Sequence, residues 1–140
     1  MKTFDPKKFL IVVGAATMGG FADGTFITAE RDEATWSKKT GADGETARNK
    51  TNNRAGKFTL TLMASSDSND VLSALAILDE LNNDGVFPIV IKDLLGRTVC
   101  AAGQAWITMP AKIEAGKELG DREWVIDSGP IEFFVGGSNA

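Results

Sequence analysis

The sequence predicts a mainly β protein with a single α-helix, and three observations support this fold class. Apolar and polar residues alternate in several short segments, most clearly in Lys57–Met63, where Phe58, Leu60 and Leu62 occupy one face. Apolar residues recur at helical spacing in one convincing stretch, Ser66–Gly85. A lone amphipathic helix cannot bury its own apolar stripe, so this helix requires a sheet to cover.

The predicted helix has recognisable ends and two distinct faces. Asp67 or Ser68 can cap its first turn, and Gly85 suits the left-handed position that follows a helix. Asp79 and Glu80 lie on the outward face, and no Lys or Arg occurs between Asp67 and Asp84. The apolar stripe, which is expected to pack on the sheet, consists of Val71, Leu72, Leu75, Leu78 and Leu81.

The remaining strands are inferred from short apolar or alternating runs between turn residues. Gly103 is expected to mark a bulge, Gly129-Pro130 to break the chain between two strands, and Ala111–Asp121 to form a loop. Gly136–Ala140 is expected to be a polar tail. The strands are expected at Phe9–Val13, Thr25–Arg31, Ala34–Thr40, Phe87–Lys92, Arg97–Met109, Arg122–Asp127 and Ile131–Val135.

The stretch from residue 37 to residue 54 predicts a hairpin arm with no core face. Asp43-Gly44 is a strong signal for a tight turn, and the return segment Glu45–Asn53 is almost wholly polar. Such an arm projects from the body or lies on a partner, and a solvated flexible loop is the alternative. Between Ser37 and Lys57 the charge is +4, from Lys38, Lys39, Arg48, Lys50, Arg54 and Lys57 against Asp43 and Glu45.

Composition narrows the chemistry. The 140 residues are 43% apolar and 24% charged with a net charge of −4, which suits one globular domain over residues 1–140 and disfavours general nucleic-acid binding. The sequence has no His and one Cys, so imidazole-based catalysis and an internal disulfide are excluded. Adjacent carboxylates such as Asp32-Glu33 diverge in an extended chain, and no constellation indicates an enzyme, a metal site or a cofactor.

The N-terminal region needs separate treatment because Lys7–Ala16 superficially resembles a signal peptide. Asp5 and Pro6 interrupt the basic start, and the glycines that follow favour a turn into another strand. No segment approaches the ~18 apolar residues of a membrane span, so membrane insertion is not expected.

Several segments, in order along most of the chain, resemble the tail tube proteins of contractile-tailed bacteriophages. The similarity lies mainly in the Gly-Ala-Asp-Gly-Glu turn at Gly41–Glu45 and the Ser-Asn-Asp-Val-Leu helix start at Ser68–Leu72. Further matching stretches are Phe21–Phe26, Gly56–Met63, Arg122–Val125 and Phe134–Gly137.

This resemblance implies a β-sandwich or half-barrel flanked by one helix. Six subunits would close their sheets into a multi-subunit β-barrel ring, and stacked rings would form the inner tube that conducts DNA during ejection. The implied partners are further copies of the chain, the tail sheath protein, the baseplate or hub, the tail terminator and the tape-measure protein. DNA would pass without specific binding, and the protein would assemble in the bacterial cytoplasm and reside in the virion.

Within this picture, three groups of residues become candidate contact sites. The arm residues Lys38, Lys39, Asp43, Gly44, Glu45, Arg48, Lys50 and Arg54 are expected to bridge adjacent rings. Glu123 and Asp127 are expected to line the lumen, while Asp79 and Glu80 are expected to face the sheath. Two other readings stay open, namely a monomeric β-rich module whose basic hairpin holds an acidic ligand, and an enzyme that uses carboxylates.

Overall fold

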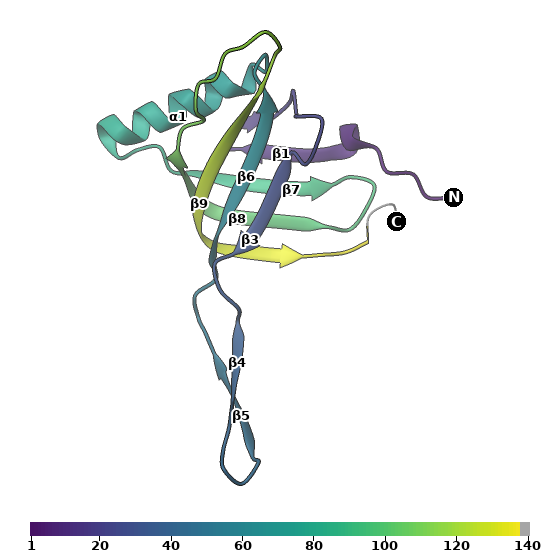
Figure 1. Cartoon of the computed structure of the whole chain (residues 1–140), viewed down its shortest axis with the longest axis vertical. Coiled ribbons are helices and arrows are strands. Elements are labelled where there is room, and N and C mark those ends of the chain that lie inside the picture. Colours follow the sequence, from purple (N-terminus) through teal and green to yellow (C-terminus); the bar gives the residue numbers. More distant parts are fainter. Residues whose placement is uncertain (138–140) are drawn as a thin grey trace.

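One bent antiparallel sheet forms most of the protein, with a helix on one side and a long hairpin extending from one end (Figure 1). The computed structural model describes residues 1–137, so the last three residues of the predicted tail lie outside the described part. The expected mainly β fold with one α-helix is confirmed. Its elements are η1 (Pro6–Lys8), β1 (Phe9–Val13), β2 (Ala16–Thr17), β3 (Ile27–Arg31), β4 (Trp36–Thr40), β5 (Thr46–Lys50), β6 (Ala55–Met63), α1 (Ser68–Asn82), β7 (Phe87–Asp93), β8 (Val99–Met109) and β9 (Asp121–Phe134).

The strand order in the seven-stranded sheet is β2-β1-β7-β8-β9-β6-β3. The predicted break at Gly129-Pro130 is wrong, because β9 runs through it as one strand of 14 residues. Pro130 pairs opposite Ala55 at a register shift, where the missing N–H is tolerated. A second shift, where Ala102 to Ala105 of β8 oppose Ile89 to Phe87, confirms the bulge expected at Gly103.

These bulges bend the sheet so that its two halves face each other across the core. In Figure 1, β9 first runs beside β6 and then turns to run beside the start of β8. The two ends of the sheet approach each other through aromatic rings. The Phe26 ring stacks on the Phe21 ring with 4.6 Å between their centroids, and it meets the Phe9 ring edge-on with 6.0 Å between centroids. Among the described residues no hydrogen-bonded ladder joins β3 to β1 or β2, so the monomer is an open half-barrel and not a closed one.

The core lies inside this bend and is filled from both halves of the sheet and from α1. Phe58, Leu60 and Leu62 of β6 are fully buried, as their alternation predicted. The helix contributes Leu72 and Ala76 to the core, and Trp124 of β9 donates a hydrogen bond from Nε1 to Asn69 Oδ1 at 2.9 Å. The helix therefore packs on the core side of the sheet, mainly against β8, and reaches β9 through this hydrogen bond.

The apolar stripe of α1 is only partly covered, which corrects the prediction for its second half. Val71 and Leu75 pack against the core, but Leu78 and Leu81 are 38% and 76% exposed. Figure 1 shows the cause, because the C-terminal half of α1 extends beyond the strands. The residue that ends the helix in the left-handed conformation also differs from the prediction. It is Asn83, with φ 56°, and not Gly85.

Gly85 is required for a different reason. A Cβ at this position would collide with the carbonyl oxygen of Leu75 and with Asp79. At the other end of α1, Asp67 occupies the cap position without a capping hydrogen bond from its side chain. Ser68 Oγ instead accepts a hydrogen bond from Gly19 N at 3.0 Å, which ties the helix start to the loop after β2.

The predicted arm forms a separate two-stranded sheet of β4 and β5, which projects away from the body in Figure 1. Every residue of both strands is exposed, which confirms the expected hairpin without a core face. The connection is a five-residue loop, Gly41–Glu45, and Gly44 adopts φ 89° within it. Gly41 N donates to Glu45 O at 2.8 Å, and this bond closes the loop.

Candidate functional site

The two faces of the arm differ in charge. Strand pairing sets Trp36 opposite Lys50 and Lys38 opposite Arg48, so these four side chains share one face. The guanidinium of Arg48 lies 4.0 Å from the centre of the Trp36 ring, and Lys50 Nζ lies 5.9 Å from it. The indole thus holds two cations on the same face by cation–π attraction.

The opposite face of the arm carries small or neutral side chains apart from one cation. It consists of Ser37, Lys39, Ala47 and Asn49. The two acidic residues of the arm, Asp43 and Glu45, lie in the loop at the tip, where Asp43 Oδ1 accepts a hydrogen bond from Glu45 N at 3.1 Å. The two strands of the arm are therefore basic, and the loop at its tip is acidic.

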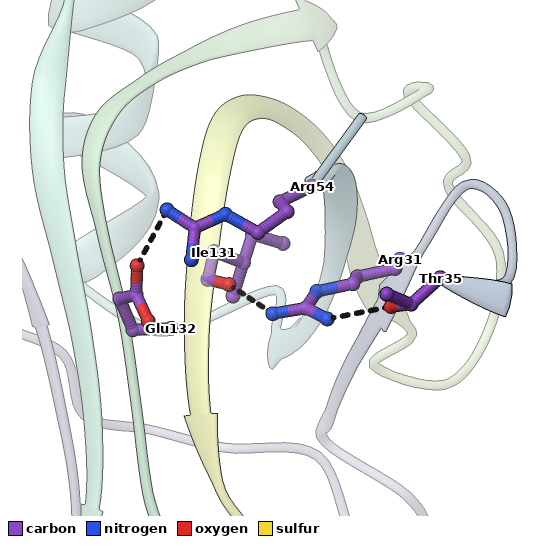
Figure 2. A network of polar contacts seen from close by, with 5 residues as sticks. All are labelled: Arg31, Thr35, Arg54, Ile131 and Glu132. Atoms are coloured by element: carbon purple, nitrogen blue, oxygen red, sulfur yellow. Dashed lines mark hydrogen bonds and ion pairs between the residues drawn. The ribbon is translucent and has the colours of Figure 1, made fainter. Parts of the chain in front are cut away.

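The root of the arm is tied to the second half of β9 (Figure 2). Arg54 Nη2 lies 3.0 Å from Glu132 Oε1, so this arginine, expected among the arm contacts, pairs with the body. Lys57 likewise pairs with Glu30 at 3.7 Å. Among the described residues, no ion pair involves Lys38, Lys39, Arg48 or Lys50, and these four remain available to a partner.

Glu123 and Asp127 lie together on the face of the sheet that points away from the core. They alternate along β9 with the buried Trp124 and Ile126, and α1 packs on the buried side. Asp127 Oδ2 accepts a hydrogen bond from Thr108 Oγ1 at 2.5 Å. The same face presents Thr28 and Glu30 of β3, Lys57, Thr59 and Thr61 of β6, and Trp106 of β8.

This polar face, formed by β3, β6, the first half of β9 and the last residues of β8, is weakly acidic. On this face the strands carry the charges of Glu30, Lys57, Asp121, Glu123 and Asp127, of which Glu30 and Lys57 form an ion pair. Hydroxyl groups separate them, so the surface offers water-compatible groups without a basic cluster. A polyanion would find little attraction there.

Asp79 and Glu80 have different surroundings on α1. Asp79 is half-buried, and its Oδ1 accepts a hydrogen bond from Gly85 N at 3.2 Å, so its carboxylate helps to close the turn after the helix. Glu80 is exposed beside the uncovered Leu81. The outward surface at this end of α1 is therefore a mixture of acidic and apolar groups.

Local sequence patterns did not identify two unpaired stretches of strand that flank the polar face, which are separate from the sheet edge formed by β2. Within the described residues β3 pairs with β6 alone, which leaves its other side unpaired there. On β8, pairing with β7 stops at Ala105, so Trp106–Met109 pair with β9 on one side and, within residues 1–137, with no strand on the other. The polar face thus ends in an unpaired strand at each side.

The remaining chemistry-bearing groups do not converge. Cys100 is buried as expected, and burial raises the pKa of its thiol to about 11 although nearby Arg31 opposes that shift. In the part of the chain that is described, no group of three metal-ligating side chains comes together. No described helix is both long and apolar enough to cross a membrane.

Comparison with known proteins shows which family the chain belongs to. The family described as bacteriophage PhiTE tail tube protein matches residues 10–136 of the chain. The chain is 30% identical over 144 residues to structural protein ORF10 of Pseudomonas phage KPP10, covering 97% of this chain and 83% of that protein.

Two solved structures have a similar fold at low sequence identity. The anti-feeding prophage cap, described as a tube-terminating cap, gives a TM-score of 0.66 at 12% identity and covers 96% of this chain and 92% of that one. A chain of the extended PVC sheath–tube complex, from an extracellular contractile injection system, gives 0.59 at 13% identity, covering 94% and 91%. The family match spans nearly the whole chain, and the protein therefore belongs to the bacteriophage PhiTE tail tube family.

Proposed function

We propose that this tail tube protein forms hexameric rings that stack into the inner tube of a contractile phage tail, the conduit through which DNA is ejected. The observation that supports this proposal best is the pair of unpaired edges on either side of the polar face, on β3 and on the last residues of β8. Unpaired edges favour association with another strand, and closure into a ring satisfies both at once.

The lateral contact would be made by strand addition between neighbouring subunits. At the two ends of β3, Phe26 O accepts a hydrogen bond from Thr61 N, and Asp32 N donates one to Ala55 O. These two bonds show which residues along the strand direct their backbone groups toward β6. By this alternation, the N–H and C=O groups of Ile27, Ala29 and Arg31 point away from β6. Trp106–Met109 of the next subunit provides an edge on the matching side of the polar face.

Ring closure through these edges would line the lumen with the polar face. Glu123 and Asp127 would then face the channel, with α1 on the outside of the ring. Duplex DNA carries about one negative charge per 1.7 Å of its axis, so a weakly acidic, hydroxylated wall would not retain it. The chain's own residues thus suit passage without specific binding.

The arm would contact the adjacent ring, and α1 would face the sheath. Lys38, Arg48 and Lys50 offer three cations on one face to a body that carries most of the acidic residues. Glu80, with Asp79 beside it, would meet basic groups of the sheath, and replacing both with Lys should weaken sheath assembly while rings persist. The same tube would meet the terminator, the baseplate or hub and the tape-measure protein, with assembly in the bacterial cytoplasm and residence in the virion.

Electron microscopy of the purified protein tests the proposal, with an edge variant to locate the contact. The wild type should form rings or tubes at high concentration. Ala29→Pro removes an N–H that points away from β6, so the hydrogen bonds between β3 and β6 are kept and the variant should give folded monomers. Ala29→Ser keeps the N–H and should assemble.

The possible outcomes separate the function from the interface. Uniform wild-type monomers at high concentration would contradict tube formation and favour a monomeric module that holds an acidic ligand with its basic hairpin. Normal rings of the Ala29→Pro variant would instead show that β3 is not the lateral edge.

A further inference from the structure

We propose that Arg31 is a positioning residue that holds the arm in one fixed direction before assembly. The arm would then reach the adjacent ring already aligned, and would not become ordered only on contact. The claim that Arg31 fixes the direction of the arm in the monomer does not depend on the proposed function. The claim that this direction helps rings to stack rests on the proposed function.

The Arg31 guanidinium joins three parts of the chain at the root of the arm (Figure 2). Its Nη2 donates to the carbonyl oxygen of Ile131 at 2.8 Å, and its Nη1 donates to Thr35 Oγ1 at 3.3 Å. Its central carbon lies 5.4 Å from the centre of the Phe133 ring. One side chain of β3 thus connects the segment that enters β4 with the second half of β9.

The other strand of the arm is held by the same part of β9. Ile131 N donates to Arg54 O at 2.9 Å, and the Arg54 guanidinium pairs with Glu132. The two segments also bind each other, because Thr51 N donates to Thr35 O at 2.7 Å and Thr51 Oγ1 donates to Glu33. Both strands of the arm are therefore anchored to residues 131–133.

Apart from these bonds and a backbone hydrogen bond from Asp32 N to Ala55 O at 3.0 Å, no contact in the described structure holds the direction of the arm. The strands β4 and β5 are exposed along their full length, and no helix or strand of the body packs on them. The segments that lead into and out of the arm have no continuous secondary structure, so they would act as hinges without these bonds. An isolated two-stranded hairpin has little rigidity of its own.

The geometry requires arginine and not merely a positive charge. The two acceptors, Ile131 O and Thr35 Oγ1, are reached by different nitrogens of one planar group, whereas the ammonium of lysine is a single point on a flexible stem. Arg31 Nε is buried without a hydrogen-bond acceptor among the described residues, which is an unfavourable arrangement for stability alone. The role assigned to Arg31 is therefore to fix direction.

A spin-label distance measurement on the monomer tests this directly. Labels at Ala42→Cys on the arm tip and Lys92→Cys on β7 occupy exposed sites, while the native Cys100 is buried and should not react. The measurement is made at a concentration at which the protein is monomeric. The wild type should give one narrow distance distribution, and Arg31→Lys and Arg31→Ala should give broad ones.

Two further variants keep the test interpretable. Thr35→Val removes only the arm-side acceptor and should broaden the distribution without touching the core. Lys57→Ala removes the nearby Lys57–Glu30 ion pair and should leave the distribution narrow. All variants should melt within a few degrees of the wild type, which separates arm direction from global stability.

A narrow distribution in the Arg31 variants, or a broad one in the wild type, would overturn the proposal. For stacking, Arg31→Lys should raise the protein concentration at which tubes first appear by several-fold while single rings still form. If the wild type forms no tubes, the proposed function fails, but the monomer distances still decide the role of Arg31.

Discussion

The body and the arm are both built from antiparallel strands with alternating side chains, yet different forces determine their structures. In β6, Phe58, Leu60 and Leu62 are fully buried, so a one-residue slip would expose an entire core face. In β4, the alternation of Trp36, Lys38 and Thr40 with Ser37 and Lys39 buries no residue. The register of the arm therefore depends on its closing loop and its root, not on burial.

This difference separates stability from assembly. The body can hold its shape without the arm, because the core cluster contains no residue of β4 or β5. The arm in turn exposes cations that have no ion-pair partner among residues 1–137. Changes in the body should thus alter the free energy of unfolding, and changes in the arm should alter association.

Replacing Ala42–Asn53 with a short Gly-Ser linker should have the largest effect on assembly. The variant should fold with a thermal midpoint near that of the wild type, because the replaced residues lie outside the core. It should not form long tubes, because the bridge between rings is lost. Electron microscopy measures tube length, and a thermal melt measures stability. Tubes of normal length would show that the arm is not needed for stacking.

A matched pair of leucines on α1 tests where stability resides in the body. Leu72 is fully buried and Leu81 is 76% exposed, so the same truncation samples two environments on one helix. Leu72→Ala should cost about 2–5 kcal/mol of unfolding free energy through lost burial and the cavity left behind. Leu81→Ala should change it by less than about 0.5 kcal/mol.

Urea denaturation gives both values for the leucine pair. Equal losses for the two variants would mean that the end of α1 is covered in solution, for example by another subunit. Leu75, which the sequence placed in the centre of the stripe, is only half-buried and should fall between them.

The sequence predicted those elements whose pattern is local. The strand expected at Lys57–Met63 is observed as β6, and the expected helix at Ser66–Gly85 is observed as α1. Period and burial agree along β6 and in the first half of α1. The arm was also predictable, since polar strands around an Asp-Gly turn leave no other place for the chain. Each of these features depends on residues that are neighbours in sequence.

Features that depend on distant pairing could not be predicted in this way. β9 continues through Gly129-Pro130 because its residues there still pair with both neighbouring strands. Pro130 pairs with Ala55 of β6, and Ile131 pairs with Ala102 of β8. Leu78 and Leu81 are exposed because the sheet ends beneath them, which no helical pattern records. The bond from Arg31 to Ile131 spans 100 residues, and its one local signal is an arginine in phase with Ile27 and Ala29.

Reversing charge on the basic face of the arm should have a smaller effect than removing the arm. Lys38→Glu with Arg48→Glu changes two cations that face one another across the hairpin. Exposed ion pairs contribute only about 0–1 kcal/mol each, so tubes should still form but at higher protein concentration. Sedimentation of assembled tubes across a salt series measures this effect.

The control for this charge reversal lies on the other face of the arm. Lys39→Glu changes one cation there and should shift the threshold less than the paired change. If it shifts the threshold equally, net charge matters and the identity of the face does not.

The smallest effect is expected in the body, at the single cysteine. Burial raises the pKa of the Cys100 thiol from 9.0 to about 11, so below pH 9 the folded and unfolded chains both carry the proton. Between pH 9 and about 11 the unfolded chain loses the proton while the folded chain keeps it, so the free energy of unfolding should fall as the pH rises. Cys100→Ala should remove this part of the alkaline slope and leave the arm and its tubes unaffected. Urea denaturation at pH 8 and pH 10 compares the two proteins, and identical slopes would mean that the thiol is accessible to water in the folded body.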